Sequence, residues 1–156
     1  MASTEQVKYM KRKSIALGLL LATATAAFAH QGVKNPAVKA RMDGMSAIAE
    51  NMKTLGQMSK GATEFDVTTA RSAAAAIAKL AAATPGLFEA NETDPKSEAR
   101  SKIWSNFEDF AAKATELETI ATGFSTSINE PADLNAAMGA LGANCKSCHS
   151  VYRIEK

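Results

Sequence analysis

The chain has 156 residues, 46% hydrophobic and 22% charged, with a formal net charge of +2 at pH 7. This length suits one domain with one core. Four of the 18 basic residues fall within the first 29 positions, so the net charge does not indicate a nucleic-acid-binding surface.

Residues 1–29 have the pattern of a secretory signal. A short apolar stretch, Ile15 to Ala22, follows a basic segment that contains Lys8, Lys11, Arg12 and Lys13. The small-residue pattern Ala27-Phe28-Ala29 predicts cleavage after Ala29, which leaves residues 30–156 as the mature domain with 14 basic and 15 acidic residues. The alternative is an amphipathic anchor that is retained. Export would place the domain in the periplasm.

Proline and glycine divide the mature chain into four helical segments. The first opens at Asn35-Pro36, ends near Gly61, and repeats apolar residues at helical spacing: Val38, Met45, Ile48, Met52 and Leu55. The second begins after Asp66, a plausible N-cap, and contains the alanine-rich run 70–83. We expect Thr84-Pro85-Gly86 to end this second helix and 87–95 to form a loop.

The third helix is expected from about Lys96 to Gly123, and the fourth from about Ala132 to Tyr152. We expect Trp104 to pack in the core or to contact a cofactor, and Tyr152 to pack. Four helices with mostly short connections predict an all-α fold, an antiparallel up-down-up-down four-helix bundle.

The fourth segment contains Cys145-Lys146-Ser147-Cys148-His149, the C-x-x-C-H attachment motif of c-type haem. In such motifs two cysteines form thioethers with the porphyrin, and the adjacent histidine ligates the iron. The alternatives are a disulfide or redox pair, or a zinc site. Zinc needs four ligands, and the only other histidine is His30. We therefore expect one covalently attached haem c, which the bundle encloses.

The position of the motif, near the C-terminal end of the sequence, narrows the class of c-type cytochrome that the chain can resemble. Cys145 to Arg153, the segment Ile103-Trp104-Ser105 with Phe107 and Phe110, and the opening segment Ala37 to Arg41 together resemble the class II c-type cytochromes, the cytochrome c′ family. The resemblance implies a four-helix bundle with Arg41 near a haem propionate; a surface arginine is the alternative. It also implies a possible homodimer through the first two helices, where alanines could pack within the bundle or across a dimer.

The same resemblance points to a distal residue. The family often places an apolar side chain four residues after the opening arginine, and here that residue is Met45. A branch of the family has a methionine ligand and six-coordinate, low-spin haem. Met1 and Met10 lie in the signal, and Met138 lies on the helix of His149. Met42 lies off the apolar seam, Met52 is expected too deep in the bundle, and Met58 lies near the end of the first helix. Met45 is thus the expected second iron ligand beside His149, although a methionine that only fills the core remains possible.

Two functions follow from these residues. The first is a periplasmic electron carrier that meets periplasmic or membrane-bound redox proteins. The alternative is a five-coordinate, high-spin cytochrome c′ that binds nitric oxide or carbon monoxide. We expect a protein that is not an enzyme, because the sequence offers no catalytic triad and no distal histidine–arginine pair of a peroxidase.

Overall fold

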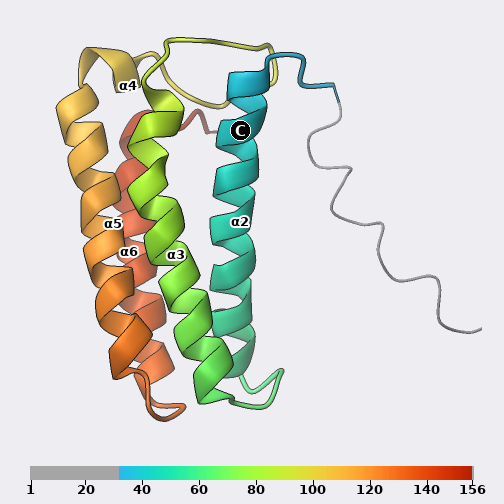
Figure 1. The fold of residues 1–156 in the computed structure, drawn as a ribbon, viewed down its shortest axis with the longest axis vertical. Helices are drawn as coiled ribbons and strands as arrows, with labels where there is room; N and C mark the ends of the chain where they lie inside the picture. Colours follow the sequence, from blue (N-terminus) through green and yellow to red (C-terminus); the bar gives the residue numbers. More distant parts are fainter. Residues whose placement is uncertain (1–31, 156) are drawn as a thin grey trace, which may run out of the picture. The chain divides into compact units, whose positions relative to one another are not determined.

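The computed structural model describes residues 32–155. Four long helices alternate in direction, and a short helix precedes the third of them (Figure 1). In chain order they are α2 (Pro36–Ser59), α3 (Val67–Phe88), α4 (Lys102–Ser105), α5 (Phe107–Ser127) and α6 (Asp133–Tyr152). This arrangement confirms the predicted antiparallel four-helix bundle. The predicted signal and His30 lie outside the described residues.

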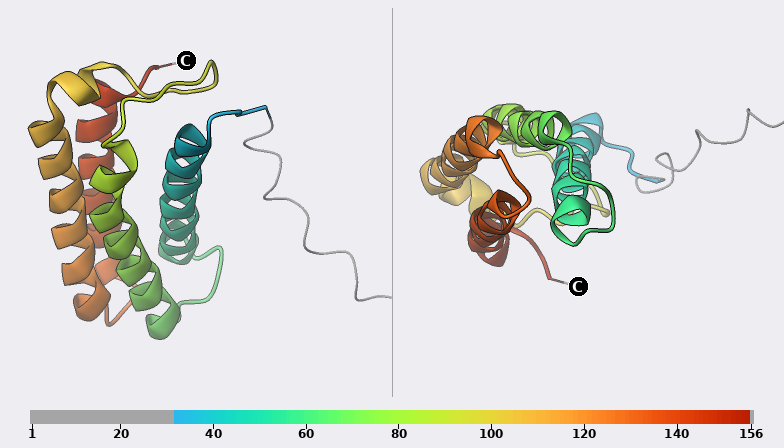
Figure 2. Two further views of the ribbon diagram at one scale, coloured as in Figure 1. Left: turned by 45° about the horizontal axis from the view of Figure 1, so that its top comes forward. Right: turned by 90° about the horizontal axis from the view of Figure 1, so that it is seen from below.

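Each of the four long helices contacts two neighbours. Helix α3 packs against α2 and α5, and α6 packs against the same two helices (Figure 2). The contact between α2 and α6 is the least extensive of the four. The end of α2 meets the start of α6, where the Ser59 hydroxyl donates to Asn135 Oδ1 at 3.1 Å. Between residues 32 and 155, no helix is long and apolar enough to cross a membrane.

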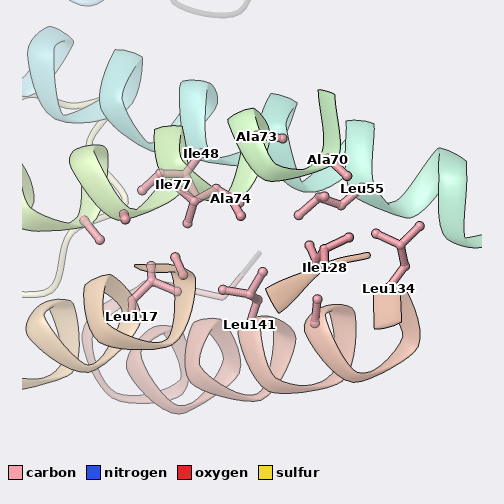
Figure 3. Packing of buried hydrophobic residues seen from close by; sticks show 14 of the residues in the cluster. Ile48, Leu55, Ala70, Ala73, Ala74, Ile77, Leu117, Ile128, Leu134 and Leu141 are labelled. Carbon is pink, nitrogen blue, oxygen red and sulfur yellow. The ribbon is translucent and has the colours of Figure 1, made fainter. Parts of the chain in front are cut away.

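The larger of two hydrophobic clusters fills the space between the four helices (Figure 3). We call it the bundle cluster, and its largest fully buried side chains are Leu55, Ile77, Ile128, Leu134 and Leu141. Burial of each stabilises the fold by roughly 1.5–3 kcal/mol. Buried alanines on α3, among them Ala70, Ala74 and Ala81, allow neighbouring helices to approach closely.

The second cluster lies at the end of the bundle where α2 starts and α6 ends. We call it the aromatic cluster, and its buried members are Phe88, Ile103, Phe110 and Tyr152. The rings of Phe88 and Phe110 are 4.9 Å apart between centroids, and Tyr152 meets Phe110 edge-on at 5.4 Å. These tilted and edge-on arrangements are favourable for aromatic pairs.

Local capping explains the starts of α2 and α3. The Asn35 side chain accepts a hydrogen bond from the Val38 amide at 3.0 Å, and Pro36 occupies the first turn, where its missing N–H is harmless. The Asp66 carboxylate accepts from the Thr69 amide at 2.6 Å, and hydrogen bonding by the Thr69 side chain and, next, by this amide lowers the pKa of Asp66. Both predicted starts are confirmed.

The predicted end of the second helix at Pro85 is wrong, because α3 continues to Phe88. Two long-range contacts stabilise the added turn. The Phe88 side chain is buried in the aromatic cluster, and the Leu87 carbonyl accepts a hydrogen bond from Arg41 Nε at 2.8 Å. Tertiary contacts therefore outweigh the helix-breaking tendency of proline.

The predicted third helix from Lys96 to Gly123 is also wrong in its boundaries. Residues 89–101 form a connection, the helix is broken at Asn106 between α4 and α5, and it extends to Ser127. Asn106 has a non-helical backbone, with φ −141° and ψ 46°, and its side-chain amide donates to the Tyr152 hydroxyl at 2.8 Å. The break is thus stabilised by a residue of α6.

Candidate haem-binding site

Helix α6 carries the cysteine–histidine motif on its last turns. Cys145 and Cys148 are free thiols and half-buried, whereas His149 is exposed. Positions three and four apart lie on one side of a helix, and Cys148 packs against the aromatic cluster. The helix therefore offers two sulfur atoms and a neighbouring imidazole to one flat ligand, an arrangement that fits a c-type haem.

The local environment sets the protonation of these groups. Burial raises the pKa of both thiols, and that of Cys148 reaches about 11 although the nearby Lys113 charge opposes the rise. Partial desolvation and the charge of Arg153 lower the pKa of His149. The imidazole is accordingly neutral at pH 7, and neutral imidazole is the form that binds metal.

Backbone hydrogen bonds join the end of α6 to the connection before α4, from the Arg100 amide to the Tyr152 carbonyl at 2.9 Å and from the Ile154 amide to the Glu98 carbonyl at 2.8 Å, and side-chain contacts add to them. The Tyr152 hydroxyl donates to Asp109 Oδ2 at 2.6 Å and accepts from Asn106 Nδ2 at 2.8 Å. Just beyond the helix, Arg153 forms an ion pair with Glu98 at 2.7 Å. These contacts anchor the turn that carries the motif histidine to α5 and to the connection that precedes α4.

Met45 lies on α2 at the boundary of the two hydrophobic clusters. Its half-buried side chain packs against both clusters. Within residues 32–155 no other methionine packs against the aromatic cluster, which Cys148 also contacts. Met52, Met58 and Met138 belong to the bundle cluster alone. The fold therefore places Met45, alone among these methionines, against the same cluster as the attachment motif.

Arg41 lies one turn before Met45 on α2 and is 3% exposed. Its guanidinium donates to three backbone carbonyls: Leu87 at 2.8 Å, Glu92 at 2.7 Å, and Ala90. Desolvation lowers its pKa, against the raising effect of the Glu92 charge. Arg41 is therefore not a surface arginine, which was the alternative that the sequence allowed. A contact between Arg41 and a haem propionate stays a prediction.

Several residues that shape this end of the bundle were not predicted from the sequence. Phe88 was expected in a loop, and Asn106 and Asp109 on a continuous helix. Trp104 packs against the aromatic cluster, as expected for a packing residue, and its Nε1 also donates to the Phe88 carbonyl at 2.8 Å. The aromatic residues themselves were a usable signal, since five of the six after residue 87 contribute to or pack against this cluster.

Comparisons with known proteins agree with one another. The family model described as Cytochrome C' matches residues 36–153. The cytochrome c-556 of Agrobacterium fabrum is 33% identical over 148 residues, which cover 94% of this chain and 99% of that protein. The solved structure of cytochrome c′ from Rhodopseudomonas palustris has a TM-score of 0.73 and 31% identity, covering 79% of this chain and 99% of that one. An NMR-validated structural model of oxidized R. palustris cytochrome c556 has a TM-score of 0.72 and 25% identity, covering 78% and 98%.

Proposed function

This chain belongs to the cytochrome c′ family, and on that premise we propose that it is a periplasmic electron carrier whose iron is ligated by His149 and Met45. It carries one covalently attached haem c. We propose that its two cysteines, Cys145 and Cys148, form the thioether bonds to this haem. The haem supplies one-electron chemistry when bound. The protein supplies the ligands, the surrounding packing and the surface that meets a partner.

The position of Met45 is the observation that carries the proposal. The Met45 thioether packs against the aromatic cluster that Cys148 also contacts, and it lies on a helix antiparallel to the one that carries His149, so it would offer the iron a ligand from a second helix. Methionine–histidine ligation is an established arrangement in c-type cytochromes and raises the reduction potential. A ligand on each side leaves no open position, which favours electron transfer over binding of small molecules.

The surface around the motif suits a transient partner. Lys146 and Ser147, the two residues between the motif cysteines, are exposed, so this part of α6 is accessible to another protein. Redox partners meet through small interfaces that dissociate quickly. We therefore propose periplasmic or membrane-bound redox proteins as partners, and we propose no nucleic-acid partner.

Cytochromes c′ are periplasmic, and they generally carry electrons or bind gases rather than act as enzymes. For this chain we propose export by residues 1–29 with cleavage after Ala29. A homodimer also remains a prediction. Most alanines of the 70–83 run face the bundle core, while Ala75, Ala82 and Ala83 are exposed on α3 and could contact a second copy.

The competing function is a five-coordinate cytochrome that binds nitric oxide or carbon monoxide. The similar proteins include both a cytochrome c-556 and a cytochrome c′, so membership of the family leaves both functions open. The two functions differ at the sixth position of the iron. A methionine thioether must leave before a gas can bind, whereas a methionine that only packs leaves the position open.

The test is the absorption spectrum of the holoprotein when oxidised, reduced, and reduced with carbon monoxide. An electron carrier with methionine-ligated iron should show sharp α and β bands when reduced and a sulfur-to-iron charge-transfer band when oxidised. Its reduced spectrum should respond little to carbon monoxide. Met45→Leu should convert the low-spin spectrum to a high-spin one, whereas Met52→Leu, a matched change deeper in α2, should not. A high-spin wild-type spectrum that shifts at once with carbon monoxide would instead establish gas binding.

A further inference from the structure

Arg41 is the only lysine or arginine within residues 32–155 whose side chain is buried. A buried cation is unfavourable unless its donors find partners. All three guanidinium nitrogens donate to backbone carbonyls, and the guanidinium carbon lies 4.9 Å from the Phe88 ring centroid and 5.3 Å from that of Trp104. Hydrogen bonds and cation–π contacts therefore hold the group in one orientation.

The partners of Arg41 belong to a segment far along the chain. The carbonyls at the end of a helix have no intrahelical donor, and here Arg41 supplies donors to the end of α3 and to the connection behind it. Trp104 adds a fourth bond by donating to the Phe88 carbonyl at 2.8 Å. We call Arg41, Trp104 and the carbonyls of 87–92 the arginine clamp.

The clamp acts on the part of α2 that carries Met45. Arg41 and Met45 are four residues apart and share one side of the helix. Between them, Gly44 faces α3 so closely that a Cβ there would lie 3.1 Å from Leu87 Cδ1. Upstream, the Asp94 carboxylate accepts from the amides of Lys34 at 2.8 Å and Asn35 at 3.1 Å. The 87–94 segment thus contacts α2 after Arg41, at Gly44, and contacts the two residues that lead into α2 before it.

We propose that Arg41 is a positioning residue that fixes the rotation and height of α2 and so holds the Met45 thioether at the iron. This inference rests on the proposed methionine ligation. The planar fork of arginine can bind several carbonyls in fixed directions, whereas lysine is a single flexible ammonium. The role is separate from a charge near a propionate, because a lysine would preserve the charge but not the clamp.

The test compares Arg41→Lys with Arg71→Lys in the holoprotein. Arg71 is a matched control at the opposite end of the bundle, since it donates to the Ile128 carbonyl at 2.8 Å and to Asn129 Oδ1 at 2.7 Å. Arg41→Lys should weaken the hold of methionine on iron by about 10–100-fold, the usual effect of removing a residue that orients a metal ligand. The readouts are the high-spin fraction and the rate of carbon monoxide binding; Arg71→Lys should lower only the urea midpoint.

A double-mutant cycle with Met45→Leu separates the explanations. If Arg41 acts through Met45, Arg41→Lys leaves the carbon monoxide rate unchanged in the Met45→Leu background. An equal effect in both backgrounds, or no spectral change in the single variant, overturns the inference while ligation by Met45 stands. If Met45→Leu alone leaves the wild-type spectrum and rate, the ligation fails and the inference with it.

A milder variant keeps the test decisive if Arg41→Lys yields no folded holoprotein. Trp104→Phe removes the hydrogen bond from Nε1 to the Phe88 carbonyl. It keeps an aromatic ring, although a smaller one, at this position beside the guanidinium. It should shift the spin state and the carbon monoxide rate in the same direction by a smaller factor. An unaltered spectrum and rate in folded Trp104→Phe would count against the clamp.

Discussion

Replacement of Tyr152 by phenylalanine tests how much the hydroxyl of Tyr152 contributes to the attachment of the last turn of α6. Tyr152 is 3% exposed, and its hydroxyl donates to Asp109 Oδ2 at 2.6 Å and accepts from Asn106 Nδ2 at 2.8 Å. The variant keeps the ring and its edge-on contact with Phe110. Any loss of stability therefore reports the hydrogen bonds rather than the packing.

The expected loss follows from the kind of bond removed. A hydrogen bond to a charged group contributes about 1.5–3 kcal/mol. Asp109 is half-buried and Asn106 is exposed, so water can partly replace the hydroxyl at both. We expect Tyr152→Phe to lower the free energy of unfolding by about 1.5 kcal/mol, at the lower end of that range.

The effect should also depend on pH. Burial and, next, the neighbouring Asp109 raise the pKa of Tyr152 from 10.0 to about 12. The folded protein therefore holds this proton more tightly than the unfolded chain, so the stabilisation is fully present below about pH 10 and disappears as the pH rises toward 12. The difference between wild type and variant should shrink over that interval.

Urea denaturation of the two holoproteins from pH 7 to pH 11.5, followed by circular dichroism, measures both effects. Ser105→Ala is the control, because it removes an exposed hydroxyl that donates to the Lys102 carbonyl at 3.2 Å and should change stability by less than about 0.5 kcal/mol. A Tyr152→Phe loss no larger than that of Ser105→Ala, or one that does not change with pH, would refute the reasoning.

Two further predictions concern the core and the connection over α2. Leu141→Ala removes a fully buried side chain of the bundle cluster and should lower the free energy of unfolding, measured by urea denaturation, by about 2–5 kcal/mol. The same change at half-buried Leu80 should lower it by less. Equal losses in the two variants would contradict the observed packing. Asp94→Ala removes the acceptor for three backbone amides, which lower the pKa of Asp94 below 3.8, and should reduce the urea midpoint at pH 7. The pKa of Asp94 is lower in the folded protein than in the unfolded chain, so the carboxylate stabilises the fold above about pH 3.8 and this stabilisation is lost as the pH falls through the folded-state pKa. The urea midpoints of wild type and Asp94→Ala should therefore converge below about pH 3.8. A difference between the midpoints that stays constant with pH would exclude the carboxylate as the cause.

Helices with strong local signals were predicted correctly. Asn35-Pro36 places a capping side chain and a first-turn proline in sequence, and Asp66 caps α3 in the same way. The fourth helix, expected from about Ala132 to Tyr152, is observed from Asp133 to Tyr152. In these cases the residues that begin the helix lie within a few positions of it, so local reasoning suffices.

Boundaries that depend on distant residues were not predictable. Helix α3 passes Pro85 because Arg41, 46 positions from Leu87, supplies a donor to its last turn. The break at Asn106 is likewise stabilised by Tyr152, 46 positions away. A window along the sequence contains neither partner, so proline and aromatic spacing gave the wrong boundaries.

The haem-attachment motif and the helical periodicity of α6 are properties of neighbouring residues, so the amino-acid sequence alone is enough to predict the haem chemistry. It also offered Met45 as a candidate for the second ligand. The packing of the helices was needed to show which methionine lies against the same cluster as Cys148, and that Arg41 is buried among carbonyls rather than at the surface. Both depend on how α2 packs against the end of α3, and that packing arises from contacts between residues 46 to 51 positions apart along the chain.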